Sequence, residues 1–214
     1  MLYFTSDLHL GHANAIKLCR RPFSCVEEMD ETLIANWNER VTNGDTVYIL
    51  GDLLFRNQTP TESYLDRLKG KKHLITGNHD RKWMKQVPLD KFFLSVNPML
   101  HFSDGKHNIT ACHYPMMSWP CSGKGSYMVF GHIHGNTDAD YWPLIERSEL
   151  MLNAGVDVND FRPVTFGEME ENNLKHKAHS AAMRIIDKNR DLFESIAKMQ
   201  KQFPKLLEDD IDGE

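Results

Sequence analysis

Several features are scarce or missing in this sequence, and their absence narrows the classes of protein to consider. No apolar stretch approaches the roughly 18 residues that a membrane-spanning helix needs. The chain begins with a strand-like run rather than a charged segment followed by an apolar one, so we expect no secretory signal. Basic residues are in the minority, with 25 Lys and Arg against 30 Asp and Glu and a formal charge of −5. We therefore expect a cytoplasmic protein without a membrane partner, and charge lends no support to polymeric nucleic acid as a partner.

Cysteine is also rare. The four cysteines show no C-x-x-C spacing, and we expect them to be reduced thiols of an intracellular protein. Two roles suit Cys112, which stands beside His113: a metal ligand, or a small buried strand residue. Because successive side chains of a strand point to opposite faces, we favour the second role.

What is present indicates one globular domain with an appendage. The chain has 214 residues, of which 41% are hydrophobic and 26% are charged, the usual balance of a globular protein. In its first half, strand-like segments alternate with helical ones. Strands are predicted at residues 2–6, 46–50 and 73–76, and helices at 26–40, with Ser24 as the cap, and at 61–69. Strands bridged by helices imply a parallel sheet packed against helices.

The second half is richer in short strands. They are predicted at residues 108–112, 127–130, 150–153 and 163–166, between turns that contain Gly, Pro, Asp and Asn. Together the two halves predict an α/β fold with two sheets, whose loops gather at one edge.

The C-terminal part differs from the rest. Residues 173–203 keep a helical apolar spacing, and the acidic end is expected to be disordered. We therefore divide the chain into a domain of residues 1–170, a helical extension of 171–206 and a tail of 207–214. The apolar stripe of the extension is expected to dock on the protein's own body, with self-association through the helix as the alternative.

Four short motifs rich in Asp, Asn and His follow strand-like runs. In chain order they are Asp7-Leu8-His9, Gly51-Asp52, Gly77-Asn78-His79-Asp80 and Gly131-His132-Ile133-His134, and a lone His113 follows another such run. Strand ends are where a fold presents such side chains together, and these are the residue types that hold pairs of divalent metals.

The spacing within the motifs suits metal binding. Asp7 and His9 lie two residues apart, as do His132 and His134, so each pair shares one face of an extended segment. Asp52 can bridge two ions through its two oxygens. The seven expected ligands are Asp7, His9, Asp52, Asn78, His113, His132 and His134. Mixed nitrogen and oxygen donors suit Mn²⁺, Zn²⁺, Fe or Ni²⁺ better than Ca²⁺ or Mg²⁺, so we predict two divalent ions, with Mn²⁺ first among them.

Other polar and aromatic residues are candidates for the remaining roles. His79 lies between Asn78 and Asp80, so it faces away from the metal and can act as a general acid that Asp80 orients. The candidates for contacts with the substrate are His12, Arg21 and Arg56, for which a loop role or a structural role is the alternative. We expect structural roles for His73, His101 and His107, and packing rather than base stacking for Tyr114, Trp119 and Tyr141.

The ordered motifs resemble those of the calcineurin-like metallophosphoesterases. The pattern D-x-H, G-D, G-N-H-[DE], a lone His and G-H-x-H is met in full between residues 7 and 134, and the likeness extends to about residue 168. The resemblance implies a four-layer α/β/β/α sandwich of two mixed sheets, here with the C-terminal helical extension. It implies one metal on Asp7, His9, Asp52 and His134. It implies a second metal on Asp52, Asn78, His113 and His132, with His79 as the catalytic histidine.

Two differences from the protein phosphatases of this family bear on the substrate. Residues 51–57 lack the Asp-Arg-Gly stretch of the protein phosphatases, and the third motif ends in Asp80 rather than Glu. The chain is more similar to small microbial and phage phosphoesterases, some of which carry a stretch like Gly155-Val156-Asp157-Val158.

The sequence as a whole predicts an enzyme that hydrolyses phosphate esters through attack by a metal-bridging hydroxide. Because the chain holds no large insertion to build a cap, we expect an open site, which favours a phosphodiester or another nucleotide-like substrate. The alternatives are a phosphomonoesterase, a metal-dependent nuclease, or a non-catalytic protein-binding scaffold with the same fold.

Overall fold

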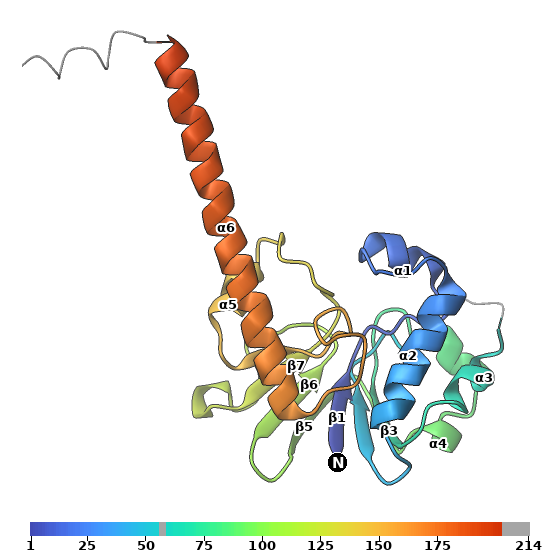
Figure 1. Cartoon of the computed structure of the whole chain (residues 1–214). Coiled ribbons are helices and arrows are strands. Elements are labelled where there is room, and N and C mark those ends of the chain that lie inside the picture. Colours follow the sequence, from blue (N-terminus) through green and yellow to red (C-terminus); the bar gives the residue numbers. More distant parts are fainter. Residues whose placement is uncertain (56–58, 203–214) are drawn as a thin grey trace, which may run out of the picture. The chain divides into compact units, whose positions relative to one another are not determined.

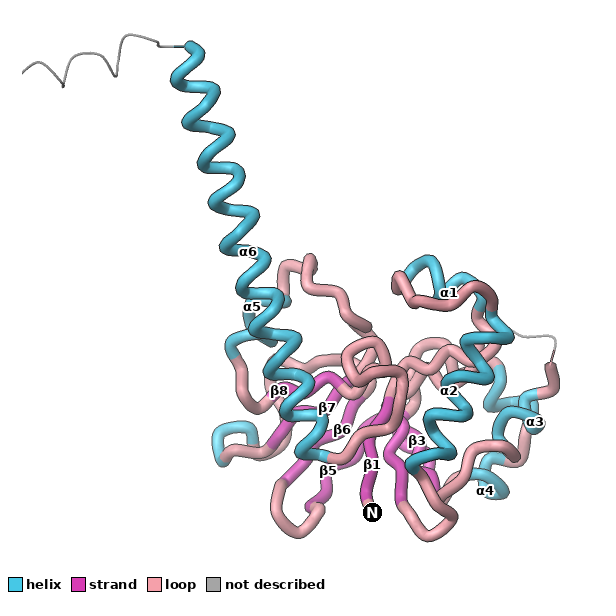
Figure 2. Tube along the Cα trace, in the orientation of Figure 1, coloured by secondary structure: helices cyan, strands magenta, loops and turns pink. Residues whose placement is uncertain are grey.

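The computed structural model describes residues 1–55 and 59–202. It divides into two compact units, Met1–Leu174 and the part from Lys175 onward, which is helical up to Gln202. Figure 1 labels most of the elements, and Figure 2 shows the loops that connect them. The described residues of the first unit form two four-stranded sheets. Arg56 and the expected tail of 207–214 lie outside the described residues.

The first sheet is parallel. Its strands are β1 (Leu2–Thr5), β2 (Thr46–Ile49), β3 (Lys71–Ile75) and β4 (Ser95–Asn97), in that order across the sheet. Tyr3 pairs with Val47, and Tyr48 pairs with His73. Because all four strands run the same way, their carboxyl ends lie along one edge.

The second sheet is mixed. Its strands are β5 (Met99–Ser103), β6 (Asn108–Cys112), β7 (Tyr127–Phe130) and β8 (Met151–Asn153), again in sequence order. β5 runs antiparallel to β6, whereas β6, β7 and β8 are parallel to one another. Single bridges from Phe4 to Val164 and from Ser6 to Gly155 connect β1 and its following loop to the segment after β8.

The described helices are α1 (Ala13–Leu18), α2 (Val26–Arg40), α3 (Thr61–Leu65), α4 (Leu89–Phe92), α5 (Trp142–Arg147) and α6 (Phe166–Gln202), with 3₁₀ turns at Trp83–Gln86 and Ser122–Lys124. α2 lies along the first sheet (Figure 1), where Leu33 and Trp37 pack with Val47 and Leu74 in one apolar cluster. The Trp37 indole N–H also donates to the carbonyl of Lys69 at 2.9 Å, so this large side chain is buried without an unpaired polar atom.

Two further clusters complete the layers. Phe4 and Leu50 from the first sheet join Ile109 and Val129 from the second, so this cluster lies between the sheets. On the outer face of the second sheet, Phe130 packs with residues of α5. The layers therefore follow in the order α/β/β/α, which confirms the predicted fold class. Both sheets were predicted to be mixed, but the strands of the first sheet are all parallel. None of the described helices combines the length and the apolar character that crossing a bilayer requires.

Most predicted elements are present. The short helices α1, α4 and α5 were not predicted, the helix predicted at 61–69 ends at Leu65, and three further details were wrong. The helix over 26–40 and the strands at 108–112 and 127–130 have the predicted bounds. Ser24 does not cap α2 with its side chain; instead its backbone N–H donates to the Glu28 carboxylate at 2.7 Å. Strands β4 and β5, on either side of Pro98, were not predicted.

The third detail concerns the start of the last helix. Residues 163–166 do not form a strand, because Val164 makes a single bridge and α6 begins at Phe166, earlier than predicted. The Glu168 carboxylate accepts from the Thr165 N–H at 2.8 Å, and Thr165 Oγ1 lies 3.5 Å from the Glu168 N–H. This reciprocal capping box starts the helix seven residues before the predicted position of Asn173. The predicted domain boundaries and the predicted docking of the helical stripe stay predictions.

Candidate metal centre

The predicted ligands lie in loops that follow β1, β2, β3, β6 and β7. Five of them have a left-handed backbone: Asp7, His9, Asp52, His132 and His134, with φ between 52° and 70°. Residues other than glycine rarely adopt this conformation, which costs roughly 1–3 kcal/mol each and clusters at functional sites. Asp and His adopt the left-handed conformation more readily than most residues. The residue types that bind metals are therefore also ones that can occupy these turns.

Two glycines let the ligand loops approach one another. A Cβ atom on Gly77 would lie 2.3 Å from Asp52 Oδ1, and one on Gly131 would lie 1.9 Å from Ser6 Oγ and 2.6 Å from Asp7 Oδ2. Any side chain at these positions would therefore displace a predicted ligand or its neighbour. The glycines that precede the motifs are needed for close approach.

The first group of ligands is Asp7, His9 and His134, whose ligand atoms lie within 4.8 Å of one another. Asp7 and His9 are buried. Burial raises the pKa of Asp7 to about 6, against the effect of His134, and lowers the pKa of His9 to about 3. Asp7 Oδ2 accepts from the His132 N–H at 2.8 Å, whereas Asp7 Oδ1 and His9 Nδ1 are buried without a hydrogen-bond partner among the described residues. A buried carboxylate oxygen without a hydrogen-bond partner is suited to binding a divalent cation.

The second group is Asp52, His113 and His132, again within 4.8 Å. His113 Nδ1 lies 2.7 Å from the carbonyl oxygen of Leu50, so this nitrogen carries the hydrogen and donates it. Its Nε2 atom consequently faces the centre, 3.0 Å from the Asn78 amide oxygen. The carbonyl of Leu50 thus fixes which nitrogen of His113 faces the centre.

Asp52 lies between the two groups. Its Oδ2 atom is 3.7 Å from His9 Nε2 and 3.4 Å from His113 Nε2, while Oδ1 accepts from the His79 N–H at 2.9 Å. Burial raises the pKa of this carboxyl, but the hydrogen bond and charge of His113 outweigh burial and bring the pKa down to about 2. An ionised carboxylate between two sets of imidazoles is the arrangement that a bridging ligand requires.

The His79 side chain lies at the edge of the centre. Its Nε2 atom is 3.9 Å from Asp52 Oδ2 and its side chain is 38% exposed. It lines a cavity of about 820 Å³ together with His9, His12, His132 and His134. The His12 ring stacks on Phe55 with centroids 3.7 Å apart and lies 6.3 Å from the His79 ring. Of the predicted substrate contacts, His12 is thus placed beside the centre.

Asp80 has a different role from the predicted one. Its carboxylate is fully buried and does not orient the His79 ring. It accepts four hydrogen bonds of 2.8 to 3.0 Å, from the N–H groups of Asp52, Leu53 and Gly77 and from the indole of Trp83. Asp80 therefore joins the loops after β2 and β3, and both of its oxygens are already used.

The prediction for Arg21 was wrong. Its guanidinium is buried and forms a bidentate pair with Asp157, at 2.8 and 2.9 Å, and it donates to the carbonyls of Asp7 and Leu8 at 2.6 and 2.9 Å. These contacts leave it no face toward a phosphate. It supports the backbone of the first motif instead.

The sequence signalled Asp157 only as part of a family-like stretch, without a role. In the structure its Oδ2 atom lies 2.7 Å from His134 Nδ1. Burial lowers the pKa of His134, but the hydrogen bonds to Asp157 and Cys19 outweigh burial and raise it to about 10. The contacts with His134 and Arg21 likewise outweigh burial for Asp157 and lower its pKa to about 2. A carboxylate behind a ligating histidine fixes the orientation of the ring.

Cys19, His134 and Asp157 also lie close enough to hold an ion. Both Asp157 oxygens already accept from Arg21, so we assign this cluster to the positioning of His134 and not to a third metal. Cys112 packs against the third apolar cluster, in agreement with its expected strand role.

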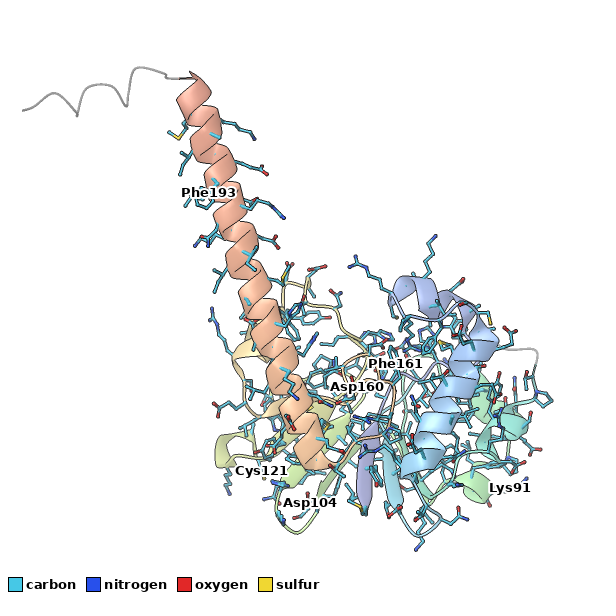
Figure 3. All side chains as sticks on the ribbon, viewed as in Figure 1. Lys91, Asp104, Cys121, Asp160, Phe161 and Phe193 are labelled. Carbon is cyan, nitrogen blue, oxygen red and sulfur yellow. The ribbon has the colours of Figure 1, made fainter. Side chains whose placement is uncertain are left out.

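The histidines expected to be structural make contacts away from the centre. His73 Nδ1 lies 2.8 Å from Ser95 Oγ, and His101 Nδ1 lies 2.9 Å from Thr110 Oγ1. His107 Nδ1 lies 2.9 Å from an Asp104 carboxylate oxygen; Figure 3 labels Asp104.

Comparison with known proteins agrees with this geometry. Residues 2–175 match the family model of the calcineurin-like phosphoesterases. The uncharacterized protein MJ1445 of Methanocaldococcus jannaschii is 36% identical over 166 residues, which cover 77% of this chain and 86% of that protein. The gene 66 protein of Mycobacterium phage L5 is 28% identical over 62% of this chain and 76% of its own length.

A solved structure shows the same fold. The protein of unknown function AQ665 from Aquifex aeolicus aligns with a TM-score of 0.63 at 24% identity, covering 80% of this chain and 98% of its own. The family model spans nearly the whole first unit, including every motif that supplies the two ligand groups. The chain therefore belongs to the calcineurin-like phosphoesterase family, and it is a hydrolase that acts on phosphoester bonds.

Proposed function

We propose that this protein is a phosphodiesterase that acts on nucleotide-like substrates and uses two divalent metal ions, with Mn²⁺ as the first candidate. The position of Asp52 carries the proposal, because its Oδ2 atom faces both His9 and His113. One ion would be held by Asp7, His9, Asp52 and His134. The other would be held by Asp52, Asn78, His113 and His132.

The donor set fits such ions. It combines carboxylate and amide oxygens with imidazole nitrogens, and the buried Asp7 Oδ1 atom has no other partner among the described residues. Two divalent ions bound there would lower the pKa of a bound water molecule and place positive charge next to the phosphate oxygens.

Residues of the chain supply the other parts of the reaction. His79 stands partly exposed in the cavity, where its ring can deliver a proton to the departing ester oxygen. The hydrogen bond from the His79 N–H to Asp52 Oδ1 fixes the backbone that carries this ring. Asp157 holds His134 in its orientation, and Asp80 keeps the two neighbouring loops together. The site opens into a cavity of about 820 Å³, which leaves room for both ester groups of a diester.

The test compares a diester with a monoester. Protein loaded with Mn²⁺ is assayed with bis-(p-nitrophenyl) phosphate and with p-nitrophenyl phosphate, and we expect faster release of p-nitrophenolate from the diester. Cleavage of the monoester alone would assign a phosphomonoesterase. Faster cleavage of long oligonucleotides than of dinucleotides would assign a nuclease, and failure to cleave any phosphoester would leave a binding scaffold.

The role of His79 needs its own variant. His79→Asn should lower turnover by about 10²–10⁴-fold, the usual contribution of a general acid, with no change in bound metal as measured by elemental analysis. His179→Asn, at an exposed position of α6, is the matched control and should behave as the unmodified protein. Unchanged turnover in His79→Asn would refute the assignment.

A further inference from the structure

An apolar cavity of about 540 Å³ lies beside the metal centre. The side chains that define it here are Tyr114, Met117, Trp119, His132, Tyr141 and Leu144. Four of these are large hydrophobic residues with exposed fractions of 46% (Tyr114), 81% (Met117), 43% (Tyr141) and 50% (Leu144). Exposed apolar side chains gathered in one place indicate a binding surface, and no Lys, Arg, Asp or Glu is among the described residues that line it.

The cavity is continuous with the metal centre. His132 lines both this cavity and the one that contains His79. The Tyr114 ring lies 4.6 Å from the His132 ring and 5.1 Å from the His113 ring, so it stands directly against two predicted ligands. Tyr141 lines both cavities as well. One molecule could therefore place a phosphate at the metal centre and another of its groups in the apolar cavity.

The wall of the cavity is held in place without a ligand. The Trp119 indole N–H donates to the carbonyl of Ser126 at 2.9 Å, and the Ser126 hydroxyl donates to the carbonyl of Pro120 at 2.5 Å. Trp119 also packs against the third apolar cluster, which includes Phe130 and Trp142. The Trp119 side of the cavity is thus preorganised, which lowers the entropy lost on binding.

We propose that this cavity binds the base of a nucleotide phosphodiester, with Tyr114 and Tyr141 as stacking surfaces; the proposal rests on the proposed phosphodiesterase function. The volume falls within the range of small-molecule sites, about 300–1,000 Å³. A base is flat and has a π-face, and it stacks on aromatic side chains whatever its identity. Half-exposed tyrosine rings suit a flat group with one face in water, and a methionine adapts to its edge. From the sequence, packing was expected for these tyrosines rather than stacking, but their exposure favours stacking.

The first experiment measures binding apart from catalysis. Metal-free protein is titrated with adenosine, and the methyl and aromatic signals of the cavity are followed by NMR. We expect saturable shifts that Tyr114→Ala weakens and Tyr114→Phe retains. Shifts without hydrolysis of any phosphoester would refute the proposed function and leave the cavity assignment standing. Shifts with octyl phosphate but not with adenosine would assign the cavity to an alkyl chain and overturn the proposal.

The second experiment measures selectivity in the Mn²⁺-loaded protein. Thymidine 5′-(p-nitrophenyl phosphate) and methyl p-nitrophenyl phosphate release the same product, and only the first carries a base. The ratio of their kcat/KM values should fall by about 5- to 150-fold in Tyr114→Ala, the loss expected for one stacking contact, and should recover in Tyr114→Phe. Leu144→Ala, at a half-exposed position, should lower the ratio in the same direction. Leu94→Ala, also exposed (64%) but away from the centre, is the control. A ratio that stays constant in both cavity variants would overturn the proposal.

Discussion

Replacing Asp80 by asparagine removes one of the two carboxylate oxygens that join the loops after β2 and β3. Oδ2 accepts from the N–H groups of Asp52 and Gly77, and Oδ1 accepts from those of Leu53 and Trp83. In the variant an amide nitrogen would face two of these four donors. Since the site is fully buried, water cannot replace the lost acceptor.

The magnitude follows from this count. A buried donor left without an acceptor costs about 1–3 kcal/mol, so two of them lower the free energy of unfolding by about 2–6 kcal/mol. Domains of this kind have about 5–15 kcal/mol in total. With an m value of about 2 kcal/mol/M, the urea midpoint should fall by about 1–3 M.

The assay is urea unfolding followed by circular dichroism, with and without Mn²⁺. Asp66→Asn is the matched control, because its side chain is 61% exposed and only approaches Lys91 at 4.0 Å; its free energy of unfolding should change by less than about 0.5 kcal/mol. If Asp80→Asn unfolded at the same urea concentration as the unmodified protein but lost turnover, Asp80 would act on His79 as the sequence suggested. The structural role would then be refuted.

Two further substitutions test the support of the centre. Asp157→Asn should weaken Mn²⁺ binding about 10- to 100-fold in calorimetric titration, because His134 loses the carboxylate that orients it; unchanged affinity would contradict this role. Gly77→Ala should reduce the bound metal below two ions per chain, since the new Cβ would lie 2.3 Å from Asp52 Oδ1. Gly123→Ala, which meets no atom within 4 Å, should bind metal normally, and equal metal content in the two variants would refute the close-approach argument.

Much of the centre could be predicted because its information is local. The two-residue spacing of Asp7 and His9 and the strand-like run before each motif require no knowledge of distant contacts. Helix α2 was predicted for the same reason, since its core face repeats at helical spacing over residues 26–40. The Thr165–Glu168 capping box was also local, and the prediction of a strand at 163–166 overlooked it.

The supporting residues could not be predicted, because their partners are far away in the chain. Arg21 and Asp157 are 136 residues apart, and nothing near either residue indicates the other. Asp80 stands next to His79 in the sequence, which suggested a shared role, but its carboxylate points to groups from a different loop. Phe161, labelled in Figure 3, is likewise far from Phe23 in the sequence, yet the centroids of the two rings lie 5.2 Å apart.

The groups that hold the ligand loops are, for the most part, distinct from the ligands. Asp80 holds the loops of Asp52 and Gly77, and the Arg21–Asp157 pair holds the loop of Asp7. The ligand loops are therefore joined by contacts that involve no metal ion. During evolution, ligand residues can therefore be substituted while these supporting contacts are kept. Proteins with this fold can then differ in their metal preference according to the metals available in each cell.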